Sequence, residues 1–189
     1  MSFIKPDKDM MPLSQIPFRY TPGEKAVLSG TISNGNTTWF KNGLKHRDDD
    51  LPAIEWVNGT REWYKNGLRH RDTDNPSLIW SYGTIEWYKD GKRHRDNDMP
   101  AVIHADGSKE WYTNGLCHRD GDFPAIVWAD GTELYYKQGK IHRSGAKYAV
   151  IVPKHNMYEW WIDGTQYRFP IYFIRLSLAT LKRCCFWKK

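Results

Sequence analysis

A repeat of 24 residues is the feature that most constrains how this chain can fold. Aromatic residues recur at this interval along most of the sequence, at Trp39, Trp63, Trp87, Trp111 and Tyr135, and Trp160 follows after 25 residues. Units in an array of such short period pack only on their neighbours, so each unit is one supersecondary element. We therefore expect residues 31–167 to form about five and a half repeats.

Two glycine positions in each repeat predict that the units are β-hairpins. The glycines alternate at spacings of 8 and 16 residues, and most of them follow Asn or Asp. Asn-Gly and Asp-Gly favour type I′ hairpin turns, in which both central residues need a positive φ. The longer arm contains Asp-x-Asp-x-Pro, so it is either one bent strand or two short strands. The predicted fold class is all-β, an elongated antiparallel β-hairpin repeat array.

Equivalent residues of successive repeats are expected to stack in columns along the array. One structural column consists of Trp39, Trp63, Trp87, Trp111 and Trp160. The next residue along a strand points to the opposite face. The column on that face contains Tyr64, Tyr88, Tyr112 and Tyr136, which we interpret as a candidate surface for a protein partner.

A His-Arg-Asp-x-Asp-x-Pro motif forms further columns. The histidines are His46, His70, His94, His118 and His142, and the arginines that follow them are Arg47, Arg71, Arg95, Arg119 and Arg143. Histidine with paired carboxylates could bind Zn²⁺, Mn²⁺ or Ca²⁺. The structural interpretation is preferred, because a site repeated in every unit is not an active site. In it Arg pairs with Asp of its own or the adjacent repeat, and His donates from one ring nitrogen and accepts at the other. No catalytic, cofactor-binding or metal-binding residue is therefore assigned.

Two residues depart from their columns. His104 stands where other repeats have Trp56, Trp80 and Trp128, and we interpret it as a packing replacement. Cys117 belongs to a column that otherwise contains Lys45, Arg69, Arg93 and Ile141. That mixture suggests a tolerant position and an incidental cysteine.

The segment ADGSKEWYTNGLCHRD, with its Asp-Gly, Trp-Tyr, Asn-Gly and His, resembles the membrane occupation and recognition nexus (MORN) family of β-hairpin repeats. The unit differs by one extra residue and by Arg-Asp-x-Asp-x-Pro after the histidine. This 24-residue variant is similar to repeat proteins of giant DNA viruses. The resemblance implies a scaffold or adaptor, often a homodimer and in some members linked to acidic phospholipids. It also implies a viral source, and hence the host cytoplasm or the virus particle.

Charge is distributed unevenly along the chain. There are 28 basic and 22 acidic residues, but no acidic residue follows Asp163, whereas six basic residues do. The body is therefore neutral and only the tail is basic, which argues against a nucleic-acid partner. There are three cysteines, no run of about 20 apolar residues and no apolar leader at the start, so we expect an intracellular protein that is not secreted.

The two ends are expected to cap the array. Residues 1–30 contain four prolines and are predicted to be irregular, whereas apolar spacing over residues 168–189 predicts a short amphipathic helix. This helix either packs on the last repeat or contacts an acidic membrane. The residues proposed for that contact are Arg175, Lys182, Arg183, Cys184, Cys185, Phe186, Trp187, Lys188 and Lys189.

Three functions remain open from the sequence. The preferred one is a non-enzymatic repeat scaffold for protein–protein interaction or self-association. The first alternative is a peripheral membrane adaptor that binds acidic lipid through the C-terminal segment. The second is a metal-dependent enzyme that uses the Asp and His columns.

Overall fold

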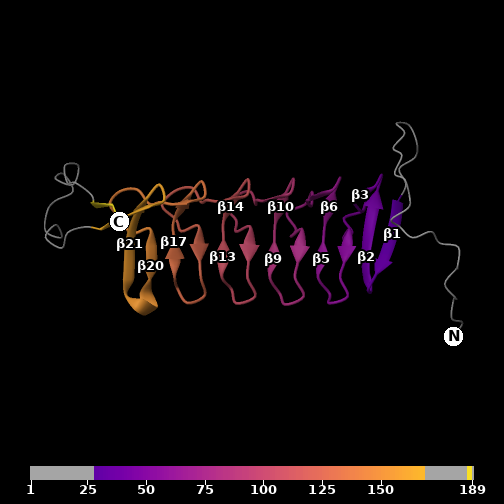
Figure 1. Ribbon diagram of the computed structural model, residues 1–189, viewed down its shortest axis with the longest axis horizontal. Coiled ribbons are helices and arrows are strands. Elements are labelled where there is room, and N and C mark those ends of the chain that lie inside the picture. The colour runs from indigo at the N-terminus through magenta and orange to yellow at the C-terminus, as the bar shows by residue number, and fades with distance from the viewer. Residues whose placement is uncertain (1–27, 169–186, 189) are drawn as a thin grey trace, which may run out of the picture.

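The computed structural model describes residues 28–168 and 187–188, and these form an elongated row of β-hairpins (Figure 1). One 15-stranded sheet runs through the whole row, and all its strand pairs are antiparallel. Its strands follow one another in sequence order, so the sheet is a meander. The predicted all-β fold class with antiparallel hairpins is confirmed.

Every repeat contributes two short strands to this main sheet. The strands are β1 (Leu28–Ser33), β2 (Asn36–Lys41), β3 (Leu44–Lys45), β4 (Ile54–Glu55), β5 (Arg61–Glu62), β8 (Leu78–Ile79), β9 (Ile85–Glu86), β12 (Val102–Ile103), β13 (Lys109–Glu110), β16 (Ile126–Val127), β17 (Glu133–Leu134), β20 (Val150–Val152), β21 (Met157–Ile162), β22 (Thr165–Arg168) and β23 (Trp187–Lys188). β3 pairs with β2 beside the main path.

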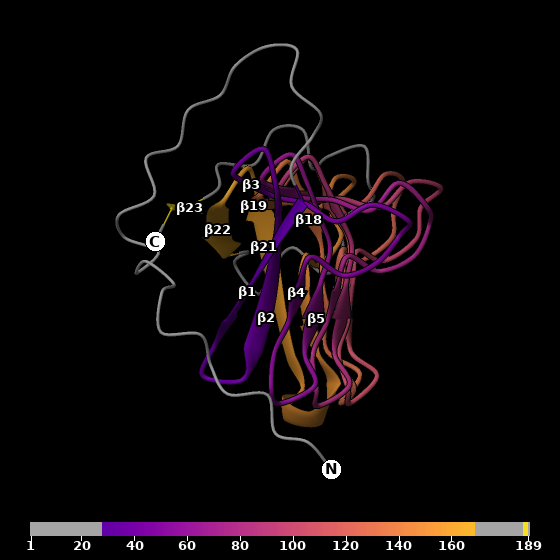
Figure 2. The same cartoon turned by 90° about the vertical axis from the view of Figure 1, so that its right-hand side faces the viewer.

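A second row of hairpins lies along the same array. It consists of the pairs β6 (Tyr64–Lys65) with β7 (Leu68–Arg69), β10 (Tyr88–Lys89) with β11 (Lys92–Arg93), β14 (Tyr112–Thr113) with β15 (Leu116–Cys117), and β18 (Tyr136–Lys137) with β19 (Lys140–Ile141). Successive hairpins are joined by single backbone hydrogen bonds, such as Gly67 N–H to the Lys45 carbonyl at 2.9 Å. The long arm is therefore two short strands in different sheets, separated by the His-Arg-Asp loop. Figure 2 views the array along its length and shows equivalent segments overlying one another.

The two hairpin turns of a repeat have different conformations. In the second-row turn, Asn66 (φ 50°) and Gly67 (φ 84°) are both left-handed, as the type I′ prediction requires. In the main-sheet turn only Gly59 has a positive φ, so the type I′ prediction is wrong there. Gly59 N–H bonds to the Trp56 carbonyl, and Asn58 Oδ1 accepts the Thr60 N–H at 2.9 Å. Asn58 therefore stabilises the turn with its side chain and not by adopting a positive φ.

The core is made of columns of equivalent residues. The aromatic column is buried, with 6–8% of Trp63, Trp87, Trp111 and Tyr135 exposed. Burial of each such ring stabilises the array by roughly 3 kcal/mol. Small residues that are fully buried form a second column: Ala53, Ser77, Ala101, Ala125 and Ala149. The third contains Ile54, Leu78, Val102, Ile126 and Val150.

The ends differ from expectation in two places. Strand β1 starts at Leu28, inside the segment assigned to the irregular N-terminal cap. Trp187 and Lys188 form strand β23, which pairs with Arg168 and Tyr167, so the predicted helix does not extend over these two residues. The other residues of that predicted helix, and residues 1–27, lie outside the described part of the chain.

The single insertion of the array lies in the last main-sheet turn. A 3₁₀ turn, η2 (Pro153–His155), is followed by Asn156 at φ 49°. Asn156 thus takes the left-handed conformation expected where the other copies have glycine. Across residues 28–168 and 187–188 the chain forms no helix with the length and apolar character needed to cross a membrane.

Candidate functional site

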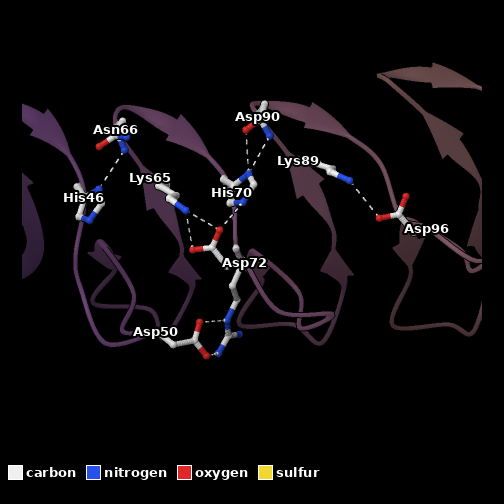
Figure 3. A network of polar contacts seen from close by, with 10 residues as sticks. His46, Asp50, Lys65, Asn66, His70, Asp72, Lys89, Asp90 and Asp96 are labelled. Carbon is white, nitrogen blue, oxygen red and sulfur yellow. Dashed lines mark hydrogen bonds and ion pairs between the residues drawn. The ribbon is translucent and has the colours of Figure 1, made fainter.

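The arginines of the motif clamp neighbouring repeats together. Arg71 Nε and Nη2 donate to the two carboxylate oxygens of Asp50 in the preceding repeat, at 2.6 and 2.7 Å (Figure 3). Arg71 Nη1 also donates to the Pro76 carbonyl of its own loop at 3.0 Å. The same chelation joins Arg95 to Asp74, Arg119 to Asp98 and Arg143 to Asp122. The expected pairing of Arg with Asp is therefore present, and it is made to the adjacent repeat.

Each clamp also involves the buried aromatic column. The Arg71 guanidinium lies 4.1 Å from the centre of the Trp63 ring, within the range of a cation–π contact. Trp63 Nε1 donates to the backbone carbonyl of Asp50 at 2.9 Å. Asp50 is thus held at its carboxylate by Arg71 and at its carbonyl by Trp63. The aspartate is read by the following repeat as one unit.

The histidines use both ring nitrogens, as predicted. His70 Nε2 lies 3.1 Å from Asp72 Oδ1 in its own loop. His70 Nδ1 accepts the Asp90 N–H of the next hairpin turn at 3.1 Å. This pattern fixes Nε2 as the protonated nitrogen when the ring is neutral. Figure 3 shows the same contact from His46 to Asn66, one repeat earlier.

The two aspartates of a motif have separate partners. Asp72 Oδ1 accepts from Lys65 Nζ at 2.6 Å, whereas Asp74 is bound by Arg95 of the next repeat. Hydrogen bonds from Lys65 lower the pKa of Asp72, and those from Arg95 lower the pKa of Asp74. The carboxylates therefore point to different cations and do not converge. In the described part of the chain no three His, Cys, Asp or Glu side chains gather as a metal site requires.

A column of buried glutamates was not anticipated from the sequence. Glu62, Glu86 and Glu110 are 6%, 4% and 8% exposed. Glu86 accepts the Trp80 indole N–H at 2.8 Å, and its other oxygen accepts from Tyr88 OH and from Arg93. Burial opposes the ionisation of Glu86, but these hydrogen bonds and the charge of Arg93 outweigh it and lower the pKa of Glu86. The available signal was the recurrence of Glu directly before the column tryptophan.

These glutamates explain where the tyrosine column lies. The hydroxyls of Tyr64, Tyr88 and Tyr112 donate to the glutamate two residues earlier, at 2.7–3.0 Å. The Arg69 guanidinium lies between two of the rings, 5.5 Å from Tyr64 and 4.7 Å from Tyr88. The tyrosines are half-buried components of the array, as is Tyr136. Their use as a partner surface stays a prediction limited to the exposed ring edges.

The fourth repeat alters this arrangement at two positions together. His104 Nε2 lies 2.6 Å from Glu110 Oε1, the place of the tryptophan indole in the repeats before it. Cys117 takes the place of Arg69 and Arg93, so Glu110 has no guanidinium beside it. Burial and the Glu110 charge raise the pKa of the Cys117 thiol to about 12, so it stays protonated at neutral pH. His104 is thus a hydrogen-bonding replacement, and the Cys117 column is not tolerant.

Exposed apolar residues lie on the loops that hold the clamps. At the position before the loop proline, Leu51 and Met99 are each 44% exposed and Phe123 is 57% exposed. We call these residues the loop-tip row. The backbone beneath them is tightly turned, since Asp49 and Asp50 both have positive φ. Grooves of 180–420 Å³ separate successive loops, and the largest, next to Phe123, has Ser144 and Lys147 on its far side.

The basic tail contributes little to the described structure. Arg175, Lys182, Arg183, Cys184, Cys185, Phe186 and Lys189 lie outside the described residues. Only the backbone pairing of Trp187 and Lys188 with β22 is defined. Comparison with known proteins adds no family, because no family model, curated protein or solved structure matches the chain.

Proposed function

We propose that this protein is a non-enzymatic repeat scaffold that binds other proteins or a second copy of itself. The observation that carries the proposal is the loop-tip row, three apolar side chains that repeat along one edge of a stiff array. The polar groups beneath them are engaged in contacts between repeats, so the loops need no partner to be ordered. A preordered apolar row is suited to docking because little conformational entropy is lost on binding.

A paired set of variants tests the scaffold. Replacing Leu51, Met99 and Phe123 together by Ser removes the apolar row and leaves the Arg–Asp clamps intact. A matched control replaces two exposed residues of the main-sheet turns, Val57 and Tyr82, which are 75% and 63% exposed. Sedimentation of the full chain over a concentration series, together with quantitative co-purification, should show association lost only in the loop-tip variant. Equal association of both variants would contradict the proposal.

The repeat type is also proposed, as a MORN-like unit. Its support is a two-hairpin unit that carries Trp-Tyr-x-Asn-Gly and repeats every 24 residues. The associated viral source and intracellular location remain proposals from the same resemblance. Mass spectrometry of purified particles and of infected cells would distinguish a virion component from a protein confined to the host cytoplasm.

A second candidate is a peripheral membrane adaptor, favoured by the six basic residues that follow Asp163 without any acidic residue. Each basic residue near an anionic surface contributes about 1 kcal/mol. Co-sedimentation with anionic and neutral liposomes tests it, using the full chain and a variant with Lys182, Arg183 and Lys189 replaced by Gln. Binding to anionic liposomes only, lost in the variant, would favour the adaptor. Absence of binding would favour a capping role for the tail.

The metal-dependent enzyme has the least support. Asp72 and Asp74 face different cations, and His70 uses both ring nitrogens for hydrogen bonds within the array. A metal would have to displace these contacts. A thermal shift on adding Zn²⁺ or Mn²⁺, abolished by Asp96→Ala with Asp98→Ala, would revive this function.

A further inference from the structure

The N-terminal end of the array contains an inter-repeat clamp that lacks its aspartate. Arg47 lies 4.5 Å from the Trp39 ring centre and donates from Nη1 to the Pro52 carbonyl at 3.2 Å, as in the later repeats. Trp39 Nε1 is buried and has no hydrogen-bond partner. Among residues 28–168 and 187–188, no acceptor binds Nε or Nη2 of Arg47, whose Nη1 has a further contact at 3.4 Å with Glu55. Three N–H donors are thus positioned and unused.

The later repeats define which group this clamp accepts. In each of them the two guanidinium nitrogens chelate an aspartate of the preceding unit, and Trp63, Trp87 and Trp111 donate to the backbone carbonyl of the same aspartate. One period before Asp50 the chain has Ala26, which has no carboxylate. The clamp therefore selects an aspartyl residue that comes from outside the regular register. A buried indole N–H left without an acceptor costs about 1–3 kcal/mol, which such a residue would relieve.

We propose that Asp9 of the chain's own N-terminal segment occupies this clamp. Residues 7–12 read Asp-Lys-Asp-Met-Met-Pro, which matches the Asp-Asn-Asp-Met-Pro of residues 96–100 except for one additional residue. Asp9 corresponds to Asp98, the aspartate that is chelated by the next repeat. Nineteen residues separate Asp9 from the start of β1 at Leu28, and at about 3.3 Å each they can span roughly 60 Å. The segment would cap an array end that otherwise exposes unsatisfied donors.

This inference does not depend on the proposed scaffold function, because it concerns how the array ends. It also predicts polarity. At the other end the position one period after Asp122 is Ala146, so the last loop presents no carboxylate to a further unit. The Asp column thus stops at Ala on both sides, whereas the Arg column begins at Arg47. Only the N-terminal end needs an acidic partner.

Nuclear magnetic resonance of the ¹⁵N-labelled full chain tests the contact directly. Trp39→Phe identifies the indole signal of Trp39, which is then followed in Asp9→Asn and in Asp7→Asn. The control removes the same charge two residues away. We expect the Trp39 indole proton to move upfield only in Asp9→Asn, while the signal of Trp63, bonded to Asp50, stays in place. An unmoved Trp39 signal, or equal shifts in both variants, would overturn the proposal.

A double-mutant cycle gives an independent measurement. Asp9→Asn and Arg47→Lys are combined in the full chain, because Lys keeps the charge and loses the planar fork. The reference cycle combines Asp50→Asn with Arg71→Lys, whose contact is defined at 2.6 Å. We expect the two residues of each cycle to couple by about three- to tenfold in the unfolding constant. Additivity for Asp9 and Arg47 alone would overturn the proposal. So would coupling that appears only at concentrations where the chain self-associates, since the occupant would then be a second copy.

Discussion

His104 Nε2 lies 2.6 Å from Glu110 Oε1, at the position from which Trp80 donates to Glu86 at 2.8 Å one repeat earlier. The same repeat has Cys117 where Arg93 binds Glu86. Two substitutions in distant columns therefore meet at one buried carboxylate. The imidazole supplies the strong contact that the guanidinium provides elsewhere, so the polar centre of a repeat tolerates exchange only as a set.

The first prediction restores the common arrangement in the fourth repeat. Cys117→Arg places a guanidinium beside Glu110, as Arg69 lies 2.5 Å from Glu62. A charge-assisted hydrogen bond to a buried carboxylate should raise the free energy of unfolding by about 1 kcal/mol. Urea unfolding of the full chain measures it. Cys117→Met, which fills similar space without a charge, should give no gain, and an equal gain from both would show that packing alone is responsible.

The second prediction concerns the buried glutamates. Glu86→Gln leaves Arg93 without its counter-charge in a site that is 4% exposed. Breaking such a pair from one side should lower the free energy of unfolding by about 2 kcal/mol, reduced from the fully buried value because Arg93 is partly solvated. Glu55→Gln, at an exposed position of the same sheet, is the control and should change it by less than about 0.5 kcal/mol. Similar losses in both variants would mean that the Glu86 contacts carry little of the stability.

How far the sequence determines these features can be judged residue by residue. The spacing of Asn66-Gly67 was enough to predict a type I′ turn, since few residues accept two left-handed conformations in succession. The same dipeptide at Asn58-Gly59 was misread, because Asn also stabilises turns through its side chain, and only the third dimension distinguishes the two uses. Pairing of Arg71 with an aspartate was predictable from charge alone. Its choice of the preceding repeat over its own depends on how the units stack.

The buried glutamates could not be derived in this way. A charged residue beside Trp63 or Trp87 would ordinarily face solvent. Glu86 is buried because Trp80, Tyr88 and Arg93, from three strands or turns, all donate to it. Such a convergence is visible only when the repeat has been folded. For the same reason Cys117 was read as incidental, since the importance of its column derives from a carboxylate seven residues away.

The third prediction tests the clamp between repeats. Arg95→Lys keeps the charge but loses the chelation of Asp74 and weakens the contact with Trp87, whose ring centre lies 3.8 Å away. Because Asp74 is largely exposed, we expect a loss of only about 1–2 kcal/mol. Thermal and urea unfolding measure it against Arg61→Lys, at an exposed strand position. A loss confined to cooperativity would indicate that the clamps fix register more than they stabilise.

The last prediction concerns acid. Arg143 and Lys147 donate to Asp122 and lower its pKa to about 2, below the value near 3.9 of an unfolded aspartate. A carboxyl whose folded pKa is depressed stabilises the fold at all pH values above its unfolded pKa, and this contribution disappears as pH falls through the folded pKa. The urea midpoint of the full chain should therefore be steady above about pH 5 and fall between about pH 4 and pH 2. Glu62 and Glu86, whose pKa values are also lowered, act in the same direction. Asp122→Asn should flatten part of this fall and Lys147→Gln a smaller part, because Arg143 remains. A midpoint that falls just as steeply in Asp122→Asn would place the acid sensitivity in other carboxylates.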